Sequence, residues 1–250
     1  MSSSIWTQCA GASELRPLRL TAWRIVEAQH QISTRKLVST LEEHALLEDL
    51  IERAKPPDPG RGRLHYLLAT PFRYPPLRHG SRFGTRRERG IWYGSEMFET
   101  AAAELAYYRF VFLEGTRADL GSVTTDHTAF TAVLRSARGV DLAAAPFESC
   151  REAIASPTDY ADTQALGAAM REAGVEVFRY PSARQAGGGN AGVFTPAVFN
   201  GVKPRALETW HCTATRTRVE LFRRDYFTPA QLTFERERFL VQGRLPSPAL

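Results

Sequence analysis

A single acidic residue, Glu104, lies on an otherwise apolar helical stripe and is the first candidate for chemistry. In the segment AAAELAYY, the residues at helical spacing from it include Ala101, Tyr108 and Val111. An ionised carboxylate among apolar neighbours would cost on the order of several kcal/mol if it were left unpaired. The stripe therefore either faces a polar cleft or has a cation opposite it. On periodicity alone, an ordinary glutamate on the helix surface is as well supported as a functional carboxylate.

Arg82 lies in a second segment that could bind a ligand, HGSRFGTRRERG. Small residues on both sides of it would let a ligand approach the backbone, and a guanidinium can bind phosphate oxygens through two hydrogen bonds. This loop therefore suits a diphosphate. For the neighbouring Arg86, Arg87 and Arg89, a solvated basic loop is the simpler interpretation.

Two further segments carry candidate residues. Tyr93 follows Trp92 and could stack on a flat heterocycle, although such aromatic pairs more often pack in a core. Residues 180–190 (YPSARQAGGGN) combine the polar Ser182 and Asn190 with three successive glycines, whose backbone can approach a ligand closely. The run is not a dinucleotide fingerprint, because GxGxxG spacing is absent and a strand, not a helix, is expected after it.

Several common catalytic motifs are missing. The sequence contains no GxxxxGK[ST], HExxH or GxSxG, and His211-Cys212 has no partner pair at metal-ligand spacing. A phosphate-loop NTPase, a zincin and an esterase are therefore disfavoured, and we expect no metal site.

The elements that must position these residues can be read from hydrophobic patterns. A strand is expected over 90–94, and Ser95 is expected to cap a helix that runs to about Leu113. This unit would carry both Tyr93 and Glu104. Further strands are expected at 18–26, 122–134, 175–180, 193–199, 207–213 and 218–222, with a helix at 162–173. The strand-rich pattern with flanking helices predicts a mixed α+β fold.

The remaining segments complete a single domain over residues 1–250. A helix is expected from an N-cap at Ser33 to Lys55, where two prolines stop it. The proline-rich stretch 70–84 is expected to be extended, because proline restricts itself and the residue before it. The tail from Gly243 on is expected to be mobile.

Composition limits the partners and the compartment. The net charge of +5 comes from scattered arginines, which leaves nucleic acid, a phosphate-bearing small molecule and an acidic protein open as partners. Three cysteines without a CxxC pair argue against a disulfide framework and favour a reducing cytosol. We see no secretion signal and no membrane-spanning stretch, so a cytoplasmic protein is expected.

Five short pieces in a fixed order resemble the RES domain. They are AWRI at 22–25, GSRFG around Arg82, IWYGS around Tyr93, ETAAAELAYYR around Glu104 and YPSAR around Ser182. The arginine, glutamate and serine that give the family its name match Arg82, Glu104 and Ser182 in order. The resemblance runs from about 20 to 222, with a helical insertion at about 33–55.

This resemblance implies a fold similar to that of ADP-ribosyltransferase toxins and NAD⁺ as the substrate. It also implies a type II toxin–antitoxin system in which an Xre-type antitoxin covers the active site. Family members either destroy NAD⁺, by hydrolysis or phosphorolysis, or transfer ADP-ribose to a protein. The acceptor and the oligomeric state, including a homodimer, stay open.

The resemblance also suggests roles for single residues, and the chemistry fits them. A carboxylate can stabilise the oxocarbenium-like state that forms when the nicotinamide–ribose bond breaks, which is the role expected of Glu104. No metal is required, because nicotinamide leaves as a neutral molecule. The other expected roles are the diphosphate anchor for Arg82, the nicotinamide contact for Tyr93, a ribose or phosphate hydrogen bond for Ser182, a second anion contact for Arg24 and ligand orientation for Asn190.

Three alternatives remain at this point. A mono-ADP-ribosyltransferase would differ only in using a protein side chain as the acceptor. A basic nucleic-acid-binding module is suggested by the positive charge and the interspersed aromatic residues, although the arginines are spread out. A purely structural half of a repressor complex would have no need of the Glu104 carboxylate.

Overall fold

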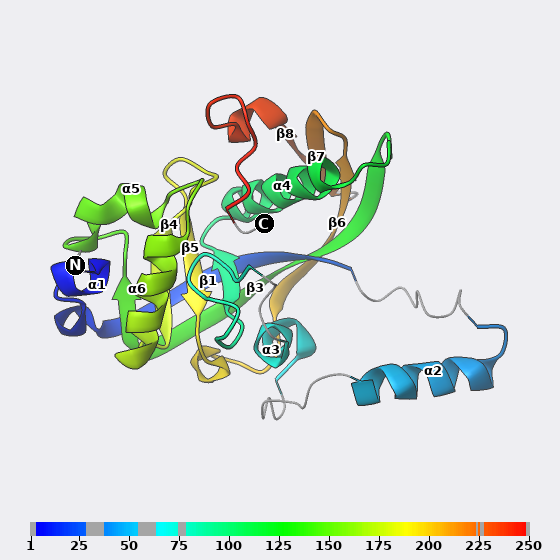
Figure 1. Ribbon diagram of the computed structural model, residues 1–250. Coiled ribbons are helices and arrows are strands. Elements are labelled where there is room, and N and C mark those ends of the chain that lie inside the picture. The colour runs from blue at the N-terminus through cyan, green and yellow to red at the C-terminus, as the bar shows by residue number, and fades with distance from the viewer. Residues whose placement is uncertain are drawn as a thin grey trace.

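The structure is a computed structural model that describes residues 4–28, 38–54, 64–74, 79–223, 225 and 228–248. Helices surround one large sheet (Figure 1). The strands are β1 (Arg16–Glu27), β2 (Trp92–Ser95), β3 (Val123–Asp141), β4 (Val177–Pro181), β5 (Gly189–Val193), β6 (Arg205–Ala214), β7 (Arg218–Arg223) and β8 (Ala230–Glu235). The α-helices are α1 (Ile5–Gln8), α2 (Leu41–Ala54), α3 (Tyr66–Arg73), α4 (Phe98–Gly115), α5 (Arg151–Ile154) and α6 (Ala161–Glu172). The 3₁₀ helices are η1 (Gly11–Glu14), η3 (Phe147–Cys150), η4 (Pro196–Val198) and η5 (Arg236–Phe239).

The sheet is mixed and closes on itself at one end. Its order is β1-β2-β5-β4-β3-β6-β7-β8, and β1 also pairs with β3. The pairings therefore form a closed circuit of β1, β2, β5, β4 and β3, from which β6, β7 and β8 extend. Only the pairing of β3 with β4 is parallel among the described strands. The predicted mixed α+β class with a strand-rich core is confirmed.

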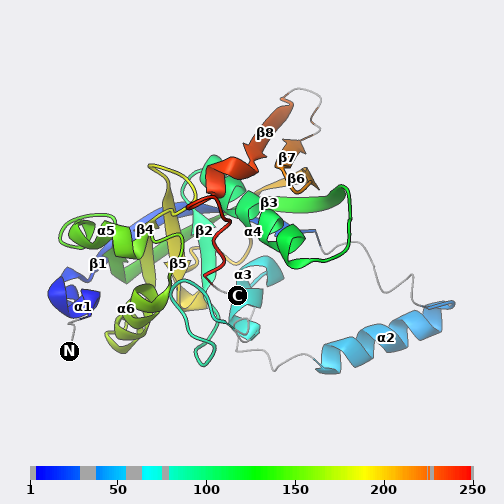
Figure 2. The ribbon, with the colours of Figure 1, turned by 45° about the horizontal axis from the view of Figure 1, so that its top comes forward.

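Helices cover the sheet at different places. Helix α4 packs over the extension, where its buried Ala106 and Phe110 share a core cluster with Trp210 and Leu221. Helices α1, α5 and α6 cover the other end, near β4 (Figure 2). The sheet therefore holds α4 beside the closed circuit. None of the helices in the described ranges is long and apolar enough to cross a membrane.

The predicted strand-to-helix unit around Tyr93 is present, with one correction. The strand is β2 and the helix is α4, but Ser95 is the last residue of the strand and does not cap the helix, which begins after Met97. Ser95 pairs in the ladder with both Trp23 and Asn190. Its side chain is only 3% exposed, because these strand partners enclose it.

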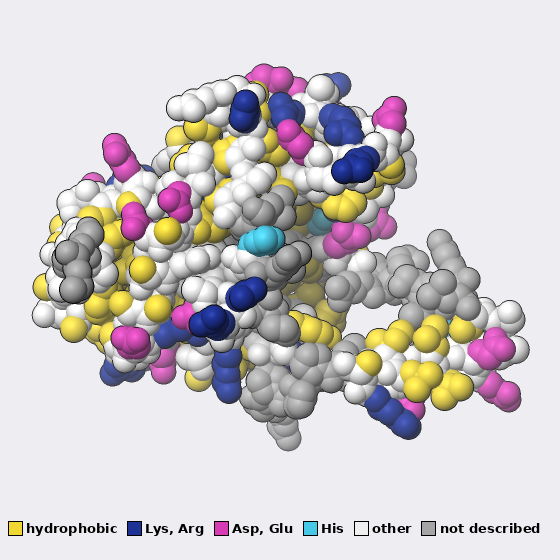
Figure 3. Space-filling view, viewed as in Figure 1, with side chains coloured by type: hydrophobic (Ala, Val, Ile, Leu, Met, Phe, Trp, Pro, Cys, Tyr) yellow, Lys and Arg dark blue, Asp and Glu magenta, His cyan; other side chains and the backbone are white. Residues whose placement is uncertain are grey.

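The predicted helix over 33–55 begins later than expected. Ser33 lies outside the described residues, and α2 starts at Leu41 after Thr40. The Thr40 hydroxyl accepts a hydrogen bond from the Glu43 amide, and the Glu43 carboxylate accepts from the Thr40 amide, which is a capping box. This helix lies apart from the sheet (Figure 3). Leu46 and Leu50, which lie one turn apart on it, are both exposed.

The proline-rich stretch is not extended throughout, as we had expected. Its first residues belong to α3, which contains Pro71. Proline removes one backbone donor from a helix, but this helix buries Leu67, Leu68 and Phe72 in the core. Tertiary burial therefore outweighs the local preference against a helix.

The region after residue 180 also differs from expectation. The glycine run ends in β5, whereas 194–199 are not a strand, because Thr195 caps η4 at Pro196. The sequence patterns did not predict β8. The tail beyond Gly243 is anchored at least in part, because Leu245 is buried and the Tyr107 hydroxyl donates to the Pro246 carbonyl at 2.6 Å.

Candidate active site

Glu104 lies on α4 and receives two hydrogen bonds on one carboxylate oxygen. Ser182 Oγ and Asn190 Nδ2 each donate to Glu104 Oε1 at 2.8 Å. The other oxygen, Oε2, has no hydrogen-bond partner within the described part of the chain. The carboxylate is therefore held at one oxygen while the second remains available.

Ser182 follows β4 and directs its hydroxyl hydrogen at this carboxylate. Its Oγ accepts hydrogen bonds from the backbone amides of Arg184 and Gln185, both at 3.1 Å. Since these two donors occupy the lone pairs of the hydroxyl, its hydrogen is directed to Glu104. In the structure Ser182 donates to the catalytic candidate, and its expected hydrogen bond to a ribose or a phosphate stays a prediction.

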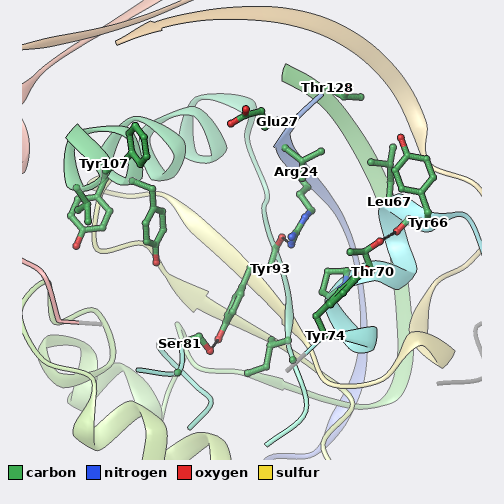
Figure 4. A pocket seen from close by; sticks show the side chains of 18 of the residues that line it. Arg24, Glu27, Tyr66, Leu67, Thr70, Tyr74, Ser81, Tyr93, Tyr107 and Thr128 are labelled. Carbon is green, nitrogen blue, oxygen red and sulfur yellow. Dashed lines mark hydrogen bonds between the residues drawn. The ribbon is translucent and has the colours of Figure 1, made fainter. Parts of the chain in front are cut away.

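Tyr93 uses its hydroxyl to hold the neighbouring loop. The hydroxyl lies 2.9 Å from Ser81 Oγ and accepts a hydrogen bond from the Phe83 amide at 3.2 Å (Figure 4). Burial raises the pKa of Tyr93 to about 12, so the phenol is neutral at physiological pH. Its ring packs edge-on to Tyr180 at 6.4 Å between centroids.

Arg82 is buried and ties this loop to the end of α5. Its Nη1 donates to the carbonyls of Ile154, at 3.2 Å, and Ser156, at 2.8 Å. The guanidinium lies 4.5 Å from the centre of the Tyr160 ring. The adjacent Gly80 has a φ of +77°, and a Cβ there would come within 2.3 Å of the Gly84 carbonyl oxygen. Gly80 is therefore required by the backbone conformation of this loop.

Of the two arginines that line the cavities, Arg24, on β1, makes fewer hydrogen bonds than Arg82 within the described residues. Its Nη1 donates to the Tyr93 carbonyl at 2.7 Å, but its buried Nε has no partner within the described residues. Burial lowers the pKa of Arg24 to about 10, which still leaves it protonated at neutral pH. In Figure 4 the side chain extends from the strand toward the backbone of Tyr93.

Two adjoining cavities surround these residues. The smaller one, of about 280 Å³, is lined by Arg82, Ser95, Glu104, Tyr180 and Asn190, among others. The larger one, of about 730 Å³, is mainly apolar and is lined by α3, by the apolar side of α4 and by Ile91. The side chains that line both cavities are Arg24, Ser81, Tyr93, Tyr108 and Tyr160.

The glycine run has a different use from the one expected. A Cβ at Gly188 would lie 2.8 Å from Thr100 Oγ1, and a Cβ at Gly189 would lie 1.8 Å from Glu96 Oε2. These glycines therefore admit neighbouring side chains of the protein itself. No cluster of His, Cys, Asp or Glu side chains in the described ranges could hold a metal ion.

Comparison with known families identifies the domain. A search among curated proteins found no match. The family model of the RES domain matches residues 53–215, which is more than half of the chain and includes Arg82, Tyr93, Glu104, Ser182 and Asn190. The chain therefore belongs to the RES domain family.

Proposed function

We propose that the protein consumes NAD⁺ by cleaving the nicotinamide–ribose bond, with Glu104 as the catalytic carboxylate. The observation that carries this proposal is the state of that side chain. The Glu104 carboxylate lines a cavity. One of its oxygens accepts hydrogen bonds from Ser182 and Asn190, and the other has no partner among the described residues. A preorganised negative group of this kind stabilises positive charge that develops at a reacting carbon.

The bond changes are those of a nucleophilic substitution at the ribose C1′. The C1′–N bond breaks, its electron pair leaves with the nicotinamide, and the positively charged pyridinium becomes a neutral pyridine. Positive charge passes to C1′ and the ring oxygen, close to the Glu104 carboxylate. Water or inorganic phosphate then forms the new C1′–O bond and releases one proton to the solvent. Because the leaving group departs neutral, no general acid is needed.

The two-part shape of the site supports a dinucleotide as the substrate. Ligand pockets usually occupy about 300–1,000 Å³, so the smaller cavity alone, at about 280 Å³, is just below that range. In this proposal the nicotinamide and its ribose occupy the smaller cavity and contact Tyr93. The diphosphate lies near Arg24, which lines both cavities, and Arg82 is a second candidate anchor. The adenosine extends into the larger cavity.

The biological role that we propose is that of a toxin in a type II toxin–antitoxin system. Membership of the RES family supports this role. The partner would be an Xre-type antitoxin that covers the cleft, and the compartment would be the cytoplasm. Loss of NAD⁺ would then arrest a cell whenever the antitoxin is removed.

The decisive experiment measures nicotinamide release from NAD⁺ by the purified protein, with and without inorganic phosphate. We expect Glu104→Gln to reduce the rate by at least about a hundredfold, because it removes the charge that stabilises C1′. Glu99→Gln is the matched control, since Glu99 is an exposed carboxylate in the first turn of the same helix. Faster release with phosphate would identify phosphorolysis.

Other outcomes would favour the alternatives. Release that occurs only with cell lysate, together with a mass increase on a protein, would identify an ADP-ribosyltransferase. Absence of release under both conditions would overturn the enzymatic proposal. A binding assay with DNA over a salt series then tests the basic nucleic-acid-binding module.

A further inference from the structure

Ser95 is a buried serine close to the candidate carboxylate. It is the last residue of β2, and the sheet register places it directly opposite Asn190 on β5. Ser95 Oγ donates to Asn190 Oδ1 at 2.7 Å, and both side chains are at most 3% exposed. Strand pairing therefore fixes this contact.

The other end of the Asn190 amide contacts Glu104. A carboxylate can only accept hydrogen bonds, so Asn190 must present Nδ2 to it, at 2.8 Å. The amide oxygen then points away from Glu104, into a buried site where Ser95 is its hydrogen-bond donor. Without that donor, the oxygen would be buried and unpaired, which disfavours this orientation of the amide.

We infer that Ser95 positions the Glu104 carboxylate by holding Asn190 in the one orientation that donates to it. The hydrogen-bond chain itself does not depend on the proposed function, whereas its expected effect on the rate of NAD⁺ cleavage rests on that function. Ser95 is a positioning residue, because it acts through Asn190. Together with Ser182, it accounts for both hydrogen bonds on Glu104 Oε1.

The kinetic test compares Ser95→Ala with the wild type in nicotinamide release from NAD⁺. We expect kcat to fall roughly tenfold and KM to stay within about twofold, because the bond chain supports the reacting carboxylate and not substrate binding. Ser95→Thr retains a hydroxyl and should recover most of the lost kcat. Addition of Ser95→Ala to an Asn190→Ala variant should have little further effect.

A matched control separates positioning from folding. Ser136 on β3 is also a buried serine that donates to a glutamate, Glu176, at 2.5 Å, and it lines neither cavity. Ser136→Ala should leave kcat and KM unchanged. Thermal unfolding of all variants shows whether each is folded at the assay temperature. Equal loss of kcat in Ser95→Ala and Ser136→Ala would overturn the inference.

A second readout does not depend on activity. The side-chain amide of Asn190 gives two proton signals in a ¹⁵N-correlated NMR spectrum, which can be assigned by their absence in Asn190→Ala. We expect Ser95→Ala to shift these signals and Ser136→Ala to leave them in place. Unchanged signals in Ser95→Ala would refute the positioning role, whether or not the wild type cleaves NAD⁺. If the Asn190 signals shift in Ser95→Ala but the wild type releases no nicotinamide, the contact between Ser95 and Asn190 is supported and only the proposed function is rejected.

Discussion

The two cavities of the cleft are built in different ways. Glu104 and Asn190 line the smaller cavity, and Glu104 accepts hydrogen bonds from Asn190 and from Ser182, which is not among the lining residues. Strand register and a tight turn set these positions. The larger cavity has walls of rings and aliphatic side chains from α3 and α4, with Arg24 and Glu27 as its charged residues. A site of the first kind fixes reacting groups, whereas one of the second kind provides contact area. Changes in the smaller cavity should therefore affect kcat, and changes in the larger one should affect KM.

The largest expected effect tests the smaller cavity. Replacing Ser182 and Asn190 together by alanine removes both donors to Glu104 Oε1. We expect kcat for nicotinamide release to fall by about a hundredfold, since hydrogen bonds to a charged group contribute about 1.5–3 kcal/mol each. Initial rates over a range of NAD⁺ concentrations measure this. A large rise in KM with an unchanged kcat would contradict the division between the cavities.

A smaller effect is expected in the larger cavity. Tyr66 stands at the start of α3 and lines that cavity. Its truncation to alanine should raise KM for NAD⁺ about fivefold at unchanged kcat, because it removes contact area for the adenosine. The same variant should act on nicotinamide mononucleotide as the wild type does, since that substrate lacks the adenosine. Phe222→Ala is the control, because Phe222 is similarly exposed (40% against 43%) but lies on β7.

The smallest effect concerns the junction of the cavities. Burial lowers the pKa of Arg24 to about 10, and only the protonated guanidinium attracts a diphosphate. As pH rises toward 10, KM for NAD⁺ should increase by about twofold, because half of the Arg24 side chains would be neutral there. Tyr93, whose pKa is raised to about 12, stays neutral over this range. A variant with Arg24→Gln should have a higher KM that no longer changes between pH 8 and about pH 10.

Local sequence patterns predicted the parts of the fold that depend on local forces. The strand and helix around Tyr93 and Glu104 follow from hydrophobic periodicity, and both are present. The proline rule wrongly predicted an extended stretch at α3, because burial of that segment against distant strands is not a local property. Ser95 was misassigned as a helix cap for the same reason. Its strand partners lie far away in the chain.

The candidate site was predictable as a set of residues but not as a geometry. Ser182 and Asn190 are 78 and 86 residues from Glu104 in sequence, and no pattern in either segment states that they meet. The sequence suggested that Ser182 and Asn190 contact the ligand, and that role stays a prediction. What it did not suggest is that both donate to the carboxylate. The glycines near them suggested room for a ligand, whereas they admit Thr100 and Glu96.

The closed circuit of strands also bears on self-association. A strand with a free edge is a template on which another chain can add by backbone hydrogen bonding, and this is a common route to aggregation. Because β1 pairs with both β2 and β3, the circuit has no terminal strand. Among the strands in the described ranges, β8 alone has a partner on one side only. The edge of β8, at the end of the sheet opposite the closed circuit, is therefore open to strand addition, and the exposed side chains of β8 are polar (Gln231, Thr233 and Glu235).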